Sequence, residues 1–222
     1  MKKTYFLILG LVIILGAAGW YVYKDLYKEP KPGFGGIVEM PDLDKKIETK
    51  DDSLPEVYVQ QVISEIENLR AELKVDPDTL QGWIQLGLLH KTLEDYEEVQ
   101  RIWEFAASIR PKDAIIFHNL GDLYHFYLPD LPRSEQSYLK AIENEPLPFI
   151  YQKLYELYRY SYKEKEELAD DILLEGIGKN PGDAVLLTTL ASYYEETGNT
   201  SGAVEYYRKA LEIVPDNEEL KS

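Results

Sequence analysis

One pattern recurs about every 34 residues through most of the chain and restricts the fold more than any other feature. Each copy has apolar residues at helical spacing, then a second apolar group, then a proline. A period of roughly 20 to 50 residues is typical of solenoids, which stack similar units. The aligned positions are Trp83, Leu86, Gly87, His90, Val99, Trp103, Ala106 and Pro111; Phe117, Leu120, Gly121, Tyr124, Ser134, Tyr138, Ala141 and Pro146; Tyr151, Leu154, Tyr155, Tyr158, Ala169, Leu173, Gly176 and Pro181; and Leu187, Leu190, Ala191, Tyr194, Ala203, Tyr207, Ala210 and Pro215.

Helix packing explains this pattern. Each copy predicts two helices of about 13 residues joined by a turn. Small residues such as Gly87 and Gly121 let helices approach closely, and large residues fill the space beside them. The prolines end the second helix, because proline cannot continue a helix and restricts the residue before it. Asp113 and Asp183 stand where a side-chain oxygen caps the following helix. We therefore predict an all-α stack of helix pairs.

These residues resemble the tetratricopeptide repeat (TPR) family over about residues 78–215. The first copy, with Trp83 and Trp103, matches the family best, and the fourth is nearly as clear. The third departs most, because Tyr155 replaces a small residue and Lys163-Glu164-Lys165 lengthens the turn. The resemblance implies a right-handed α-solenoid of four repeats, at 78–112, 113–147, 148–182 and 183–216.

Further segments flank the repeats. Residues 28–55 are rich in proline, glycine and charge, which predicts a flexible linker. Ser53-Leu54-Pro55-Glu56 resembles a capping box with proline in the first turn, and the apolar spacing after it predicts a half-repeat helix within 56–77. Residues 216–222 begin a helix that is cut short, although terminal repeats usually need a cap. Self-association through this end is one interpretation, and a tolerated edge is the other.

An apolar run over residues 5–23 is long enough to span a bilayer. Its aromatic end favours a transmembrane signal anchor at 1–27 over a cleaved signal peptide, whose site would be Ala17-Ala18-Gly19. Lys2 and Lys3 favour a cytoplasmic amino terminus. We therefore predict a single-pass protein of the cytoplasmic (inner) membrane with extracytoplasmic repeats.

Composition and motifs argue against several other functions. The net charge of −16 disfavours nucleic acid, whose binding relies on Lys and Arg, and the lack of cysteine excludes cysteine-ligated zinc. His118 and His125 flank Asp122 on one helix face, but without a fourth ligand they favour a groove lining over a metal site. His90 aligns with tyrosines and is predicted to be a core residue. No catalytic or nucleotide-binding motif appears, so we predict no cofactor and no enzyme activity.

Two acidic runs receive a structural interpretation. The carboxylates at 94–98 and 164–167 fall at turns between helices. Acidic residues near a helix start are favoured by the helix dipole. We therefore interpret both runs as solvated helix ends.

The family resemblance also implies where a partner binds, because TPR proteins commonly bind peptides in a concave groove formed by the first helix of each repeat. The clamp of Lys, Asn and Arg in chaperone-tail-binding members is absent here, so a ligand carboxylate would meet only Lys91 or Arg159. Ile84 and Leu88 contact a ligand or pack under helix 56–74, and both alternatives stay open. The matching groove positions are Gln81, Ile84, Leu88, Lys91, Ile115, His118, Asp122, His125, Gln152, Glu156, Arg159, Thr188, Ser192 and Glu195.

We therefore predict a membrane-tethered adaptor that binds a protein segment, with envelope complex assembly as its setting. The alternative is a structural subunit of a larger membrane complex, which would use its convex face and carboxyl-terminal edge.

Overall fold

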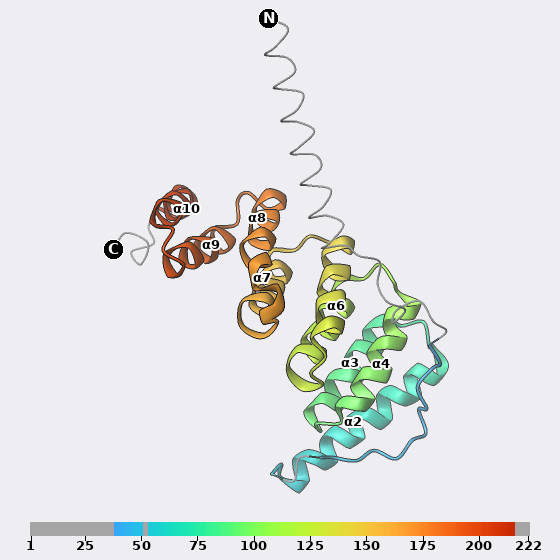
Figure 1. Ribbon diagram of the computed structural model, residues 1–222. Helices are drawn as coiled ribbons and strands as arrows, with labels where there is room; N and C mark the ends of the chain where they lie inside the picture. Colours follow the sequence, from blue (N-terminus) through green and yellow to red (C-terminus); the bar gives the residue numbers. More distant parts are fainter. Residues whose placement is uncertain (1–37, 51–52, 216–222) are drawn as a thin grey trace, which may run out of the picture. The chain divides into compact units, whose positions relative to one another are not determined.

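The computed structural model describes residues 38–50 and 53–215, and all regular structure in these ranges is helical (Figure 1). The predicted anchor at 1–27, the first part of the predicted linker and residues 216–222 lie outside the described residues. Among the described helices, none has both the length and the apolar composition that a bilayer crossing requires. The elements are α2 Glu56–Val75, α3 Leu80–Thr92, α4 Tyr96–Ile109, α5 Ala114–Asp122, η1 Leu123–Tyr127, α6 Leu131–Asn144, α7 Pro148–Glu156, η2 Leu157–Ser161, η3 Lys163–Leu168, α8 Ala169–Lys179, α9 Ala184–Glu196 and α10 Thr200–Ile213.

The helices form four consecutive pairs. In each pair the two helices pack against each other, as α3–α4, α5–α6, α7–α8 and α9–α10. Each second helix also packs against the first helix of the next pair. Asp113 accepts a hydrogen bond from the Ile116 backbone N–H, and Asp183 accepts one from Leu186, so both predicted caps are confirmed. The described residues therefore form an all-helical solenoid of the TPR type.

Close packing of small against aromatic residues holds each pair together. A Cβ atom added at Gly87 would lie 2.0 Å from Nε1 of Trp103, on the partner helix. A Cβ at Gly121 would lie 2.5 Å from the Tyr138 ring, so the first two repeats repeat the same contact. Both rings are buried. Glycine is needed at these positions because the opposing ring occupies the volume of any side chain.

The first helices of repeats two and three do not stay α-helical to their ends. They finish in π-helical turns, η1 and η2. In these two repeats the segment between the first aligned residue and the small residue of the second helix is longer than in the other two. It runs from Phe117 to Ala141 in repeat two and from Tyr151 to Gly176 in repeat three. A π turn accommodates an extra residue inside a helix, so the longer segments are partly absorbed there. Repeat three also contains the 3₁₀ helix η3, which includes the predicted longer turn at residues 163–165.

Residues before the first repeat pack onto it. The helix predicted within 56–77 is α2, which contacts α3. Its N-cap is Pro55, whose side chain makes no capping hydrogen bond, and the predicted capping box at 53–56 stays a prediction. Residues 38–50, here called the strap, differ from the flexible linker expected over 28–55. The strap lies along α2 and α4, and its Pro41 and Leu43 are buried (Figure 1).

Candidate binding face

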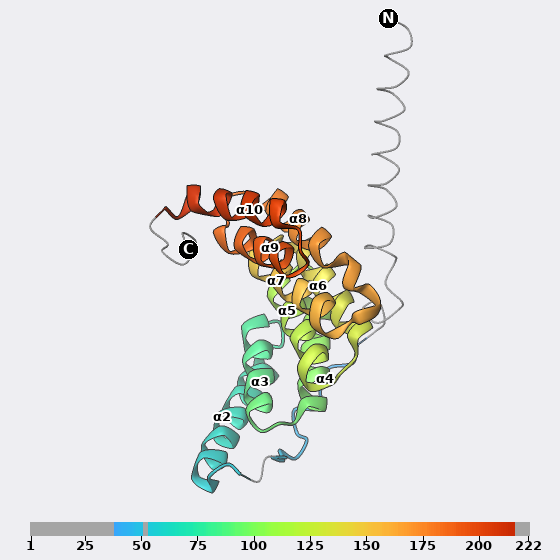
Figure 2. The same ribbon diagram turned by 60° about the vertical axis from the view of Figure 1, so that its left-hand side comes forward.

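The first helices of the repeats, α3, α5, α7 and α9, follow one another along the stack (Figure 2). Side-chain contacts join each of them to the next. The Lys91 ammonium lies 4.2 Å from the centroid of the Tyr127 ring, which η1 supplies. The rings of His118 and Phe149 lie 5.0 Å apart, and Tyr155 lies 6.1 Å from Tyr193. We call the surface formed by these helices the A face.

Exposed apolar side chains repeat at equivalent positions on the A face. Ile115, Phe149 and Val185 are each the second residue of their helix, and all three are exposed. Leu88 of α3 is 41% exposed. Single exposed apolar side chains are common on protein surfaces, and what sets these three apart is their recurrence at the same position of successive helices. The A face therefore offers separate apolar contacts on successive helices.

The structure buries some of the residues expected to line a groove. Ile84 is only 9% exposed and His125 is buried, so neither side chain is freely available to a partner. Leu88, in contrast, is open to solvent. The remaining expected positions are partly or fully exposed, namely Gln81, Lys91, Ile115, His118, Asp122, Gln152, Glu156, Arg159, Thr188, Ser192 and Glu195.

A polar cluster occupies the middle of the A face. The Tyr138 hydroxyl donates a 2.6 Å hydrogen bond to Asp122, and His118 Nε2 lies 3.7 Å from the other oxygen of that carboxylate. Burial raises the pKa of Tyr138, and Asp122 raises it further. Burial lowers the pKa of His118 against the opposing effect of Asp122, and nearby Lys153 lowers it again. This cluster is therefore a neutral histidine beside an already bonded carboxylate.

His125 is held in the same region by a different contact. Its Nε2 lies 2.7 Å from the Ser161 hydroxyl, so it joins the two π-helical turns. Burial lowers the pKa of His125. Among the described residues, no three metal-ligating side chains gather into a candidate metal site. We assign both histidines to packing and hydrogen bonding.

Most cations of the A face already have carboxylate partners. Lys153 lies 2.8 Å from Glu156. Arg159 pairs with Glu166 and lies 3.3 Å from Glu196 of α9. Within the described ranges, the Lys91 ammonium lies over the Tyr127 ring and pairs with no carboxylate. Of the two cations expected to meet a ligand carboxylate, only Lys91 has its charge available.

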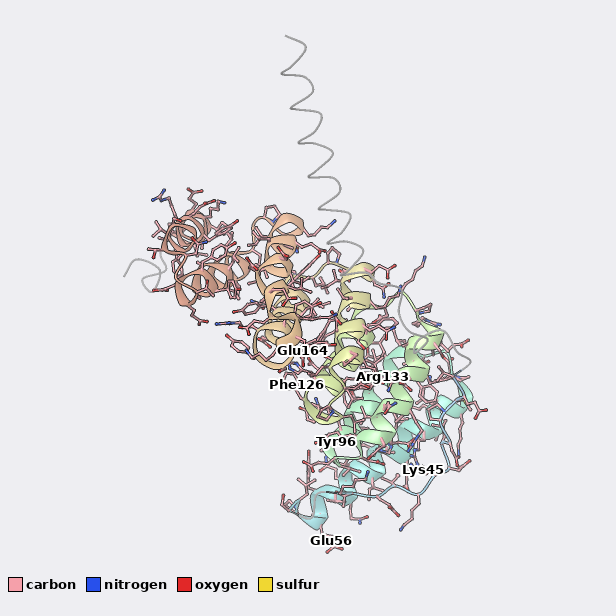
Figure 3. All side chains as sticks on the ribbon, in the orientation of Figure 1. Lys45, Glu56, Tyr96, Phe126, Arg133 and Glu164 are labelled. Carbon is pink, nitrogen blue, oxygen red and sulfur yellow. The ribbon has the colours of Figure 1, made fainter. Side chains whose placement is uncertain are left out.

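The structure shows a second cluster, beneath the strap, that the sequence interpretation missed. Glu98 is 1% exposed and accepts hydrogen bonds from Lys45 of the strap, which Figure 3 labels, and from Arg101, both at 2.5 Å. Burial alone would raise the pKa of Glu98, but these two bonds lower it below its ordinary value. The interpretation of residues 94–98 as solvated helix ends is therefore wrong for Glu98, and also for Asp95, which is buried.

Arg70 and His90 complete the cluster. Arg70 donates to the backbone oxygen of Lys45 at 2.6 Å and lies 3.3 Å from His90 Nε2. His90 is 1% exposed, so its prediction as a core residue is confirmed. Burial, together with the Arg70 charge, lowers the pKa of His90 to about 4. No sequence signal marks this cluster, because its members come from four elements, the strap, α2, α3 and α4.

Similarity to known proteins agrees with this fold. Residues 184–217 match the family model described as "Tetratricopeptide repeat". Tetratricopeptide repeat protein 37 of Xenopus laevis is 32% identical over 100 residues, which make up 45% of this chain. The matched part spans only 6% of that relative's length.

Several solved structures share the fold. The crystal structure of MamA superposes with a TM-score of 0.57 at 18% identity, over 82% of this chain and 99% of that chain. YrrB, described as a TPR protein with an unusual peptide-binding site, superposes with a TM-score of 0.51 at 18% identity. The match covers 74% of this chain and 84% of that chain. PilW, described as a type IV pilus biogenesis factor, superposes with a TM-score of 0.52 at 19% identity. The match covers 72% of this chain and 73% of that chain.

Residues 184–217 match the tetratricopeptide repeat model, and the described residues share the fold of solved tetratricopeptide repeat proteins.

Proposed function

We propose that this protein is a membrane-tethered adaptor that binds a segment of another protein on the A face. The observation behind the proposal is the set of exposed apolar side chains at equivalent positions of successive helices, Ile115, Phe149 and Val185, together with the exposed Leu88 of α3. Rigid helices that present such contacts bind with little ordering cost, which favours affinity. YrrB, which shares the fold, is described as having a peptide-binding site.

Co-purification with matched variants tests this function. A double variant, Leu88→Asp and Phe149→Asp, places two negative charges on the A face, and Val57→Asp places one negative charge on the exposed side of α2. We expect the cellular partner to co-purify with the wild type and with Val57→Asp, but not with the double variant. Equal recovery with all three proteins would contradict binding on the A face, provided that the double variant keeps its helical circular dichroism.

The tether is a separate part of the proposal. The apolar run at 5–23 supports it, together with the aromatic residues at the end of that run. We expect the chain to stay with the membrane fraction after an alkaline carbonate wash, and protease added to intact spheroplasts to degrade the repeats. Release by carbonate would contradict the anchor, and protected repeats would contradict the outward orientation.

A structural subunit is the second candidate function. Val204 and Ile213 are exposed on α10, the last described helix, and they offer an edge for assembly. If this function is correct, Val204→Asp abolishes assembly into a larger complex on size exclusion in detergent, whereas the A-face double variant assembles normally. The opposite result would favour the adaptor.

A further inference from the structure

The strap contacts the first repeat through its backbone, as a bound peptide does. Residues 38–50 contain no helix or strand. Arg70 of α2 donates to the Lys45 carbonyl oxygen at 2.6 Å, and the Lys50 backbone N–H donates to the Leu93 carbonyl oxygen at 2.9 Å. Backbone contacts of this kind give affinity without selecting particular side chains. The groove under the strap, between α2 and α4, therefore holds an irregular segment by its main chain.

Three side chains of the strap add selectivity. Leu43 is only 7% exposed. The Lys45 ammonium lies 2.5 Å from the buried Glu98 carboxylate. Farther along the strap, the Lys50 ammonium lies 3.6 Å from the carboxylate of Asp95, which is also buried. The groove thus receives one apolar side chain and two cations in the order Leu-x-Lys-x4-Lys.

The groove contains charged groups that need an occupant. Glu98 is 1% exposed and Arg70 is 6% exposed. If the strap leaves, Glu98 loses the Lys45 ammonium and Arg70 loses a carbonyl acceptor. Removing one partner of a buried charge is costly. An empty groove is therefore unfavourable, whereas a different segment with the same chemistry restores both contacts.

The strap itself is held by few buried side chains. Within residues 38–50, only Pro41 and Leu43 are buried. The side chains of Lys45 and Lys50 are 43% and 51% exposed, and ion pairs with such exposed partners contribute little stability. A cavity of about 500 Å³ lies between strap residues 38–42 and α4, where an incoming segment can make its first contacts. The strap is therefore suited to exchange with another segment.

We propose that the groove between α2 and α4 is a second binding site, for an irregular partner segment with the pattern Leu-x-Lys-x4-Lys. The strap is the intramolecular ligand of this site and closes it until such a segment displaces it. Because the strap belongs to the same chain, it competes at an effective concentration on the order of millimolar, so only a well-matched segment replaces it. The site uses α2 and α4, whereas the proposed adaptor function uses the first helices of the repeats.

Peptide binding to the full chain in detergent tests the proposal. The probe is a labelled peptide with the sequence of residues 38–50. Leu43→Asp and Lys45→Ala each open the strap through a different contact. By fluorescence anisotropy, both variants should bind the peptide at least about tenfold more tightly than the wild type, because their own strap competes less. Failure of both variants to bind, with helical circular dichroism intact, would overturn the proposal.

A closed form of the chain provides the opposite test. Lys74 of α2 lies 2.5 Å from Asp44 of the strap. The chain has no cysteine, so a bismaleimide joins only the two residues introduced by Asp44→Cys and Lys74→Cys. The crosslinked chain should bind the peptide more weakly than the wild type. Equal affinity in the crosslinked, wild-type and opened chains would show that the peptide binds elsewhere, and would overturn the proposal.

Matched substitutions locate the site and separate it from the A face. Glu98→Gln in the opened chain should weaken the peptide by at least about tenfold, because a buried charge pair is lost. Glu143→Gln removes an exposed carboxylate of α6 and should change nothing. Peptides that carry Leu43→Asp or Lys45→Ala should also bind at least about tenfold more weakly. Unchanged affinity in Glu98→Gln would overturn the site.

Two further outcomes identify a different occupant or place. The A-face double variant should bind the peptide as well as its parent, and loss of binding there would place the peptide on the A face and overturn the proposal. The wild type should remain a monomer on size exclusion as its concentration rises. Dimers that disappear on crosslinking residues 44 and 74 would make the strap of a second copy the occupant, and would overturn a partner segment.

Discussion

At the scale of single residues, the contact between Gly87 and Trp103 shows how the repeat pattern becomes structure. The Trp103 indole lies directly over Gly87, and its N–H donates to the Ile84 carbonyl oxygen at 3.3 Å. A methyl group at residue 87 cannot fit without moving a buried ring that is itself hydrogen-bonded.

Gly87→Ala should therefore destabilise the protein by about 1–3 kcal/mol through overpacking. Gly178→Ala is the matched control, because no atom lies within 4 Å of the added carbon and alanine favours a helix. It should be neutral or stabilise by up to about 1 kcal/mol. Urea unfolding of the two variants measures the difference, and equal midpoints would contradict the packing described here.

His90 gives the protein a predicted pH dependence. The folded state keeps His90 neutral down to a pH of about 4, whereas an unfolded histidine takes up a proton below about pH 6.5. The unfolded state therefore binds more protons between these values, and the free energy of unfolding falls as the pH is lowered through this window. The histidine contributes on the order of 2–3 kcal/mol to this fall.

Unfolding free energies at several pH values test this dependence. His90→Gln should have a flatter profile between about pH 6.5 and 4. The remaining slope comes from other groups, including His118 and His125, whose pKa values are also lowered. Identical slopes in the variant and the wild type would show that His90 titrates normally.

The sequence allows the structural role of a residue to be predicted when that role depends on neighbours within the same repeat. The helix pairs, the capping aspartates and the glycine at residue 87 all follow from spacing within one repeat. The burial of Glu98 does not, because it needs Lys45, which lies 53 residues away in the chain. A charged residue next to a turn is usually solvated, and only the strap reverses this expectation here.

At the scale of elements, the strap and the π-helical turns are the two features that distinguish this chain from a plain array of repeats. Lys50 of the strap donates its backbone N–H to the Leu93 carbonyl oxygen at 2.9 Å, and Lys74 of α2 lies 2.5 Å from Asp44. The strap therefore closes over the first repeat, and the buried Leu43 is its apolar contact.

Leu43→Ala should lower the free energy of unfolding by about 2 kcal/mol, because it removes a buried leucine side chain. Met40→Ala alters an exposed residue of the same strap and should have little effect. Thermal melts of both variants provide the comparison. If the strap does not pack on the first repeat in solution, Leu43→Ala and Met40→Ala will have the same melting temperature.

The π-helical turns could not be predicted from the sequence, and the reason is physical. Extra residues between two helices are accommodated either in the loop or inside a helix, and the repeat alignment fits both outcomes. In repeat three the interpretation places the additional residues in the turn, and η3 does lie there. The turns η1 and η2, which expose Phe126 and Tyr160, have no sequence signature of their own.

At the scale of the described repeats, the proposed binding depends on the stack, because the candidate positions are divided among several repeats. The candidate binding positions come from α3, α5, α7 and α9, and contacts between neighbouring helices hold them in order. The general location of the A face follows from the family resemblance. The internal pairing of Arg159 and the burial of Ile84 and His125 depend on tertiary contacts, so they required the structure.

Photocrosslinking in cells tests the central claim most directly. A photoreactive amino acid is placed at Leu88 or Phe149 on the A face, and at Glu143 or Lys179, which are exposed on second helices. Products are identified by mass spectrometry. Binding on the A face predicts one specific partner, crosslinked from Leu88 and Phe149 and absent from the other two sites. Specific products from Glu143 and Lys179 alone would contradict it and favour the structural-subunit function.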